Sequence, residues 1–535
     1  MPDPDTNDRP NAAEPSARER RGTLRPPPGG AVVRMYRIGH GDCFLLAFDG
    51  EDDTVFVLID CGYKPGSSQP LGTSPNEIVE DIRRATGGRI DVAVITHEHQ
   101  DHVNAITEPR FAGIEIEQTW LAWTESESDE VAKRLRARHR DHLQALVQAQ
   151  GRLAALPSGR SMAAILSLEI GGEEESNDVT LNAFGAGGTW TNKHAMALFR
   201  RRARLGTRFL YPHQDIVPLP GAPAVRVFPL GPPRDEKLLR SLDPVGAENF
   251  GDKPHRHGSA FDFFAAALAG DGTRASHPFE QRFTLPIDQL ATKGDLATWY
   301  RTHYGPIAGE PPPAPLASRP MTGKADRLAS RPSQLDVLPD DDESRRIETE
   351  WLLSAEALAL KMGNDTNNGS LVLAFELGRG GKVLLFAGDA QRGNWVSWAT
   401  QDFEEGGARI AVRDLLGRTV LYKVGHHGSH NATLKGEATD SHPNLAWLGR
   451  GRHANEFTAM VPAVRSWALD QDPPWNHPLP AIREALQEKC SGRVLQTDTD
   501  PDLSTPPAGI GKVAWNDFGR RVRVERLYFD YTVSP

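Results

Sequence analysis

Cysteine is scarce in this chain: Cys43, Cys61 and Cys490 are the only three among 535 residues. A sparse, odd-numbered set does not build a disulfide scaffold and is typical of a reducing compartment. No apolar run approaches the roughly 18–20 residues that a membrane helix requires. Residues 1–30 contain no apolar stretch of the kind that a secretory signal needs. We therefore expect a soluble, cytoplasmic protein with no membrane partner.

Basic residues are in the minority, with 61 Lys and Arg against 71 Asp and Glu and a net charge of −10. This balance gives no overall attraction to nucleic acid. It leaves open a local basic cleft, or a site where bound cations add charge that the composition does not show. A hydrophobic content of 39% suffices for a sizeable core, and 50 glycines and 41 prolines predict many loops.

Short apolar runs bounded by turn residues predict an α/β protein. The predicted strands are two within 32–48, around a turn at 39–42, and one each at 54–60, 90–96, 225–230, 370–376, 382–387, 419–424, 494–496 and 522–528. Helices are predicted at 76–84 and 126–156, the second capped by Ser126 or Ser128.

Composition shifts divide the chain into four parts. Residues 1–30 form a tail that we expect to be disordered, and 31–233 form the first part of a domain, with a helical elaboration at about 126–205. Residues 234–365 are predicted to be an insertion, with a Pro-rich linker or surface loop from Gly305 to about Asp342. Residues 366–535 complete the interrupted domain.

The densest chemical signal is His97-x-His99-x-Asp101-His102, directly after the buried strand at 90–96. In an extended segment His97 and His99, two residues apart, point the same way. Imidazole with carboxylate suits zinc, manganese or iron. The alternative is a polar surface loop that contains three histidines by chance. Its place at the carboxyl end of a buried strand, where α/β proteins usually build sites, favours the metal site.

Further metal-capable residues follow other predicted strands. Asp389 follows KVLLFAG, His426 and His427 follow TVLYKVG, and His477 lies in Pro474-Trp475-Asn476-His477-Pro478. Each has an ordinary alternative. Asp389 is also a suitable N-cap for the next helix, the histidine pair suits a turn, and His477 suits a surface loop.

The motifs HEHQDH, GDA and KVGHHGS resemble those of the metallo-β-lactamase-fold hydrolases. The chain is most like the C-terminal hydrolase domain of the DNA-uptake competence protein ComEC and the related phosphorylcholine esterases. The landmarks in order are IGHGDCFLLAF, VLIDCG, VITHEHQDH, NNGSLVLAFE, VLLFAGDA, YKVGHHGS, NHPLPAI and LQTDTD. The resemblance covers about half of the chain, at residues 31–125, 205–233, 366–431 and 470–500.

This resemblance implies a four-layer αβ/βα sandwich with a large insertion and a site for two divalent ions, Zn²⁺ or Mn²⁺. His97 and His99 would hold one ion, Asp101 and His102 the other, and Asp389 would bridge both. One histidine of the pair His426 and His427 would complete one coordination shell, and His477 the other. Asp42 and Asp60 would orient ligand imidazoles or, alternatively, serve only as turn residues, and Asn368 and Ser370 would shape a nearby turn.

Two departures from the family pattern stand out. The pattern has a further metal histidine between the first motif and the bridging aspartate, but His194, His213, His255 and His257 lack the expected context. One histidine of the HHGS pair is expected to take that place. His40 stands where the competence proteins tend to have glutamine.

The resemblance predicts a metal-dependent hydrolase. The favoured hypothesis is a phosphodiesterase or nuclease that acts on DNA or another phosphodiester. Two ions would lower the pKa of a bridging water, and Asp101 would orient it. The charge on a phosphoryl oxygen would be held by His427, Ser429 or Lys423. The basic stretches at 133–140 and 200–202 are interpreted as solvated helix faces in preference to a nucleic-acid groove.

Two other classes of function remain. One keeps the fold and changes the substrate to a small phosphoester, a lactone or a β-lactam, although a cytoplasmic location weakens the last. The other is a metal-binding effector or scaffold in a multi-protein system, with the 234–365 insertion as the surface for a protein partner.

Overall fold

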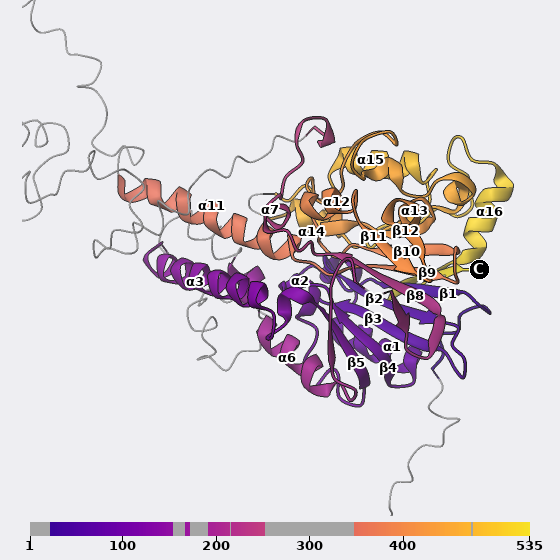
Figure 1. Cartoon of the computed structure of the whole chain (residues 1–535), viewed down its shortest axis with the longest axis horizontal. Coiled ribbons are helices and arrows are strands. Elements are labelled where there is room, and N and C mark those ends of the chain that lie inside the picture. Colours follow the sequence, from indigo (N-terminus) through magenta and orange to yellow (C-terminus); the bar gives the residue numbers. More distant parts are fainter. Residues whose placement is uncertain (1–21, 154–165, 172–190, 215, 252–346, 472–473) are drawn as a thin grey trace, which may run out of the picture. The chain divides into compact units, whose positions relative to one another are not determined.

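The computed structural model describes residues 22–153, 166–171, 191–214, 216–251, 347–471 and 474–535 (Figure 1). The described residues up to Gly251 and from Leu358 onward belong to one compact unit. Most of the predicted N-terminal tail and the whole Pro-rich tract lie outside the described residues. Among the residues described, no helix combines the length and the apolar character needed to cross a membrane.

One mixed sheet has eight strands in the order β16-β17-β1-β2-β3-β4-β5-β6. The strands β3 to β6 run parallel, and the remaining neighbours are antiparallel. Their bounds are β1 Ala31–Tyr36, β2 Cys43–Phe48, β3 Val55–Cys61, β4 Arg89–Ile95, β5 Glu115–Ala122, β6 Thr207–Leu210, β16 Val522–Val524 and β17 Tyr528–Val533.

A second mixed sheet has seven strands in the order β15-β14-β13-β10-β9-β8-β7. Here β10, β13, β14 and β15 run parallel, whereas β7 to β10 are joined antiparallel. The bounds are β7 Val217–Leu219, β8 Ala222–Gly231, β9 Val372–Leu377, β10 Lys382–Phe386, β13 Thr419–Lys423, β14 Thr458–Val461 and β15 Val494–Gln496. A small hairpin pairs β11 Asp402–Glu405 with β12 Ala408–Ala411.

Helices connect these strands. They are α1 Pro75–Thr86, α2 Gln100–Val103, α3 Glu130–Leu153, α6 Asn192–Arg202, α7 Glu236–Leu239, α11 Ile347–Asn368, α12 Arg392–Ser397, α13 Val412–Gly417, α14 Arg465–Leu469, α15 Pro480–Lys489 and α16 Lys512–Arg521. Sequence chemistry sets the ends of α1: Ser74 accepts a hydrogen bond from the amide of Glu77 at the start, and Gly87 adopts φ 67° at the end.

The two large sheets share one apolar core. Phe44 and Phe48 of the first sheet contact Phe386 and Phe375 of the second, each pair with ring centroids 5.5 Å apart. The opposite face of the first sheet is packed with side chains of α1 and α6, and that of the second with side chains of α13 and α15 (Figure 1). The prediction of an α/β class is confirmed.

Most predicted elements are found within a few residues of their expected bounds, but the last one differs. The run 522–528 was expected to be one strand and is instead split between β16 and β17. The amide of Glu525 donates to the carbonyl of Tyr528 at 2.9 Å, which closes a tight turn, and Val524 pairs with Phe529. The charged residues Glu525 and Arg526 therefore occupy a hairpin turn, and the apolar pattern resumes in β17.

Candidate metal centre

The first histidine motif spans an abrupt change of backbone. β4 ends at Ile95, His97 to His99 remain extended, and α2 begins at Gln100 with His99 as its N-cap residue. Asp101 and His102 therefore lie in the first turn of a short helix. The side chains of His97, His99, Asp101 and His102 are all buried. Gly62 lets the end of β3 approach this turn, because a Cβ atom there would lie 2.3 Å from the amide nitrogen of His102.

His97 and His99 turn one ring nitrogen each toward the other. Nε2 of His97 lies 3.1 Å from Nδ1 of His99. The outward nitrogens are engaged by the protein: Nδ1 of His97 lies 3.1 Å from the Thr96 hydroxyl, and Nε2 of His99 lies 2.9 Å from Oε1 of Glu169. A hydrogen bond on the outer nitrogen leaves a lone pair on the inner one, which is how ligand imidazoles are usually fixed.

A second group gathers His102 and His427 with carboxylates. Nε2 of His102 lies 3.2 Å from Oδ2 of Asp389, and Nε2 of His427 lies 3.0 Å from Oδ2 of Asp101. Their outer nitrogens are again held, His102 Nδ1 by Asp60 at 2.8 Å and His427 Nδ1 by the Pro462 carbonyl at 2.8 Å. Asp42, His102, Asp389 and His427 each offer a ligand atom within 4.8 Å of the others.

The turn that carries His427 is strained. His426 and His427 have φ values of 44° and 52°, in the left-handed region that glycine favours. Such conformations cost on the order of 1–3 kcal/mol each in a non-glycine residue and persist where the surrounding structure enforces them. Here the amide of His426 donates to Oδ1 of Asp389 at 3.1 Å, so the strained turn is tied to the cluster.

Buried negative charge exceeds buried positive charge at the centre. The carboxylates of Asp42, Asp60, Asp101 and Asp389 are all buried, and Lys423 lies among them. Its ammonium contacts Asp42, donates to the Gly388 carbonyl at 2.8 Å and lies 3.4 Å from Oδ1 of Asp389. Two buried lysines, Lys423 here and Lys64 near Asp101, do not balance four carboxylates, so this pocket favours further cations or protonated histidines.

The pKa values follow from this charge. Burial lowers the pKa of His102, but the carboxylates of Asp389, Asp42 and Asp60 outweigh it and raise that pKa well above its ordinary value. Burial raises the pKa of Asp389, but His102 and Lys423 bring it well below its ordinary value. Burial together with His102 and His99 holds the pKa of His97 well below its ordinary value, so His97 is neutral and able to act as a ligand.

Buried polar atoms that lack hydrogen-bond partners indicate whether metal ions fit this centre. Oδ1 of Asp42 and Oδ1 of Asp101 are buried and have no hydrogen-bond partner among the described residues. Buried polar atoms without partners are uncommon and call for an explanation such as an ion. Because imidazole nitrogen and carboxylate oxygen are the usual ligands of zinc and manganese, the residues fit divalent ions.

Two predicted ligands flank this cluster. His426 lies between amide side chains, with Nδ1 3.3 Å from Asn431 and Nε2 3.3 Å from Asn367, and burial lowers its pKa to about 4. His477 places Nδ1 3.5 Å from Nε2 of His40, and its ring centroid lies 6.4 Å from that of His427. The structure thus brings His427 into the cluster and places His426 and His477 beside it.

The other histidines considered from the sequence have different surroundings. His194 lies in the first turn of α6, where its Nδ1 accepts a hydrogen bond from the amide of Thr191 at 3.1 Å. His213 occupies a turn with φ 60°. His255 and His257 lie outside the described residues.

Sequence reasoning missed Glu169 and Lys64. Glu169 is buried against His99, and its Oε2 also lies 3.4 Å from Nε2 of His139. Glu98, His139 and Glu169 together form a second group able to hold a cation. Lys64 is buried near Asp101, and its ammonium lies 5.7 Å from the centroid of the Trp475 ring. No motif surrounds either residue, and only the folded chain brings them to the centre.

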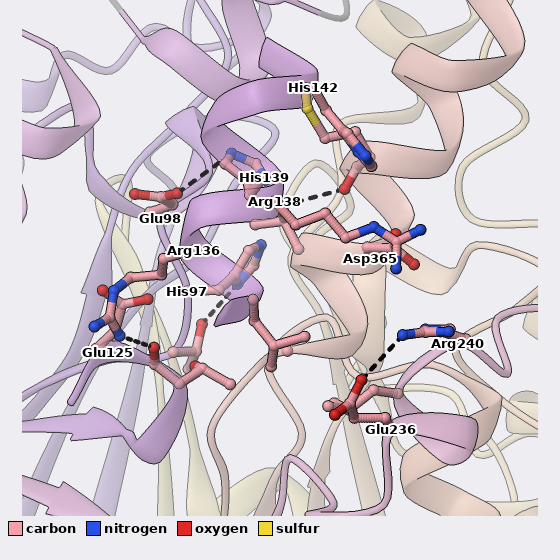
Figure 2. Close-up of a pocket in the computed structure, with 17 residues that line it drawn as sticks. His97, Glu98, Glu125, Arg136, Arg138, His139, His142, Glu236, Arg240 and Asp365 are labelled. Atoms are coloured by element: carbon pink, nitrogen blue, oxygen red, sulfur yellow. Dashed lines mark hydrogen bonds and ion pairs between the residues drawn. The ribbon is translucent and has the colours of Figure 1, made fainter. Parts of the chain in front are cut away.

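A cavity of about 130 Å³ adjoins His97 (Figure 2). Its wall is formed by one side of α3, with Arg136, Arg138 and His139, and by residues of α7 and of the end of α11. The solvated-face interpretation of the basic helix suits Lys133 and Arg134, which form exposed ion pairs with Glu130 and Glu236. It does not suit Arg136 and Arg138, which line the cavity.

Comparison with known proteins gives no family. No protein-family model matches the chain, and no curated protein matches it either.

Proposed function

We propose that this chain is a metal-dependent hydrolase with the metallo-β-lactamase fold and that it cleaves phosphodiesters. One observation carries the proposal: the residues after β4, β10 and β13 converge, so that Asp101 and His102 meet Asp389 and His427. The motif resemblance selects Asp101, His102 and Asp389 as metal ligands, and it leaves the choice between His426 and His427 open. The packing of two sheets with helices on both outer faces is what an αβ/βα sandwich requires.

Ligand roles can be assigned atom by atom. His97 through Nε2 and His99 through Nδ1 would hold one ion. Asp101, with Nε2 of His102 and Nε2 of His427, would hold the other, and Asp389 would serve both. When bound, two divalent ions supply Lewis acidity and make water a nucleophile near neutral pH. Glu169 and Asp60 fix the ring orientations of His99 and His102 through their outer nitrogens.

Two buried lysines near the centre, Lys423 and Lys64, have different roles. Lys423 is fully engaged by Asp42, Asp389 and the Gly388 carbonyl, so it balances charge and does not reach a substrate. The ammonium of Lys64 makes no hydrogen bond or salt bridge within the described part of the chain. Burial lowers the pKa of Lys64, and the carboxylate of Asp101 opposes this shift. Lys64 is therefore the cation placed to stabilise negative charge on a phosphoryl oxygen, and Asp101 is the carboxylate placed to orient the attacking water.

The test uses the full chain loaded with Mn²⁺ or Zn²⁺. Bis-p-nitrophenyl phosphate, linear and circular DNA, single-stranded DNA and RNA are offered in parallel. We expect metal-dependent cleavage that Asp101→Ala abolishes and that His442→Ala, a change at a partly exposed histidine outside the cluster, leaves intact. Equal cleavage by Asp101→Ala would assign the activity to a contaminant.

A smaller substrate is the second candidate, favoured by the cavity beside His97. At about 130 Å³, and walled partly by Leu135, Leu239 and Met362, it is too small for a nucleic-acid strand and suits a compact group. A phosphomonoester such as p-nitrophenyl phosphate and a simple lactone complete the screen. Metal-loaded protein that turns over none of these substrates would favour the effector role. A partner surface in the 234–365 insertion stays a prediction, because most of that segment lies outside the described residues.

A further inference from the structure

A second, larger cavity opens at the other end of the second sheet. Its volume is about 710 Å³. The chain leaves β9 at Leu377 and enters β10 at Lys382 beside this cavity, whereas β10 leads away from it toward Asp389. The cavity is therefore separated from the metal centre by the length of a strand, roughly 15 Å for five residues.

Arginine dominates the wall of this cavity. Seven arginines and His453 line it, against two acidic residues, Glu376 and Asp414. The whole chain has a net charge of −10, so this concentration of positive charge runs against the composition. Cavities lined by one sign of charge focus the field and attract ligands of the opposite sign.

Three of the arginines form a fixed base. Arg226 donates through Nε to Oε2 of the buried Glu376 at 2.5 Å, and Arg418 pairs with Oε1 of the same carboxylate at 2.6 Å. Arg413 donates to the Ala438 carbonyl at 3.0 Å, and its guanidinium lies 4.1 Å from the centroid of the Trp447 ring. One carboxylate thus orients two guanidinium groups, and Arg226 also pairs with Glu405, which it shares with Arg379.

Four arginines form an exposed rim. The side chains of Arg379 and Arg409 are 67% and 72% exposed, in surface pairs with Glu405 and Asp402. Arg452 donates to the Gly380 carbonyl at 3.3 Å, and Arg450, two residues earlier in the sequence, is also exposed. Exposed ion pairs contribute at most about 1 kcal/mol, so a ligand can exchange them for stronger contacts.

We propose that this cavity binds a ligand that carries several phosphate groups in succession. The planar guanidinium fork matches two phosphate oxygens at once, and several forks around one cavity match several phosphates. Apart from the imidazole of His453, the lining residues include no aromatic ring on which a base could stack. The ligand is therefore recognised by its phosphates. An oligophosphate and the backbone of a nucleic-acid strand share this chemistry, and the site does not depend on the proposed hydrolase activity.

The experiment measures binding of two probes to the full chain. Tripolyphosphate, in excess Mg²⁺ to prevent stripping of other ions, represents the oligophosphate. A fluorescent single-stranded oligonucleotide made entirely of abasic, uncleavable phosphorothioate units represents the backbone. We expect at least one probe to bind, with an affinity that falls steeply as salt rises. The probe that binds identifies the source of the phosphates.

The decisive variant reverses charge at Arg409 and Arg452 together, Arg409→Glu with Arg452→Glu. We expect at least tenfold weaker binding. The matched control, Arg520→Glu with Arg523→Glu, changes two arginines that are 72% and 65% exposed and paired with nearby acids on another surface. It should bind within twofold of wild type. Arg379→Gln, a neutral change on the rim, should weaken binding about threefold while the unfolding midpoint stays unchanged.

Two results would overturn the proposal. One is wild-type protein that binds neither probe at low salt. The other is equal weakening in the cavity and control variants, because it would show that the overall charge of the surface is responsible.

Discussion

Nε2 of His427 lies 3.0 Å from Oδ2 of Asp101, although 326 residues separate the two in sequence. Asp101 follows β4 of the first sheet, and His427 follows β13 of the second. The contact therefore forms only when both sheets have packed on their shared core. Because neither half of the chain contains the whole cluster, a metal ion that binds there also stabilises the packing of the sheets.

Replacement of Asp389 tests the two-ion arrangement. Wild-type protein, saturated and then passed through a desalting column, should retain two divalent ions per chain by mass spectrometry of the elements. Asp389→Ala should retain none, because its carboxylate faces both His102 and the His426 turn. The control Asp517→Ala changes a half-exposed carboxylate on α16 and should keep both ions. Wild-type protein with a single ion at saturation would contradict the arrangement.

Catalysis should depend on both halves of the first motif. Asp101→Ala and His99→Ala should each lower the rate of phosphodiester cleavage by about 10³-fold or more, or ~4 kcal/mol in barrier. In the proposed arrangement Asp101 would lie beside the nucleophile, and His99 would hold the other ion. Circular dichroism should show an unchanged fold, since these side chains contribute little to the apolar core. Wild-type rates in both variants would place the activity elsewhere.

The sequence predicts the part of this structure that is local. Apolar runs such as 55–61 and 90–95 become fully buried strands, and the polar residues after β4, β10 and β13 become the cluster, because strand ends fix where they lie. The hairpin at Glu525 was not predicted. Two charged residues, Glu525 and Arg526, within an apolar run are also compatible with a continuous edge strand.

Contacts between distant segments were not predictable. Glu169 meets His99 across 70 residues, and its neighbours in sequence form no motif. Asp42, expected to orient an imidazole or to serve as a turn residue, places Oδ2 3.7 Å from Nδ1 of His102 and also contacts Lys423. Both roles follow from the packing of one segment on another, which composition and spacing do not encode.

Removal of Lys423 should destabilise the protein strongly. Lys423→Met deletes the cation that contacts Asp42 and lies 3.4 Å from Asp389, and breaking a buried ion pair in this way typically costs about 3–5 kcal/mol. Urea unfolding of metal-free protein measures the loss, and Lys435→Met, at an exposed lysine, is the control. Added Mn²⁺ or Zn²⁺ should restore more stability to the variant than to wild type. A loss below about 1 kcal/mol would show that Lys423 does not balance this charge.

Glu125, on the wall of the cavity beside His97, should make stability depend on pH. Burial and the nearby carboxylate of Glu98 raise its pKa to about 7, from 4.5 for an ordinary glutamate. Between these values the folded protein keeps a proton that the unfolded chain releases, so the free energy of unfolding falls as pH rises through this window. Below pH 4.5 both states are protonated, and above pH 7 both are ionised, so the loss is then complete.

Glu125→Gln removes this titration and should remove the loss. The free energy of unfolding of wild type relative to Glu125→Gln should fall by about 2 kcal/mol between pH 4.5 and 8, the pKa shift converted at ~1.4 kcal/mol per unit and reduced for partial exposure. Urea unfolding of both proteins at the two pH values measures it, and other titrating groups cancel in the difference. Glu127→Gln, at a side chain that is 81% exposed, should run parallel to wild type. Parallel behaviour of Glu125→Gln as well would mean that Glu125 ionises as an ordinary glutamate and that its surroundings are more hydrated than its burial implies.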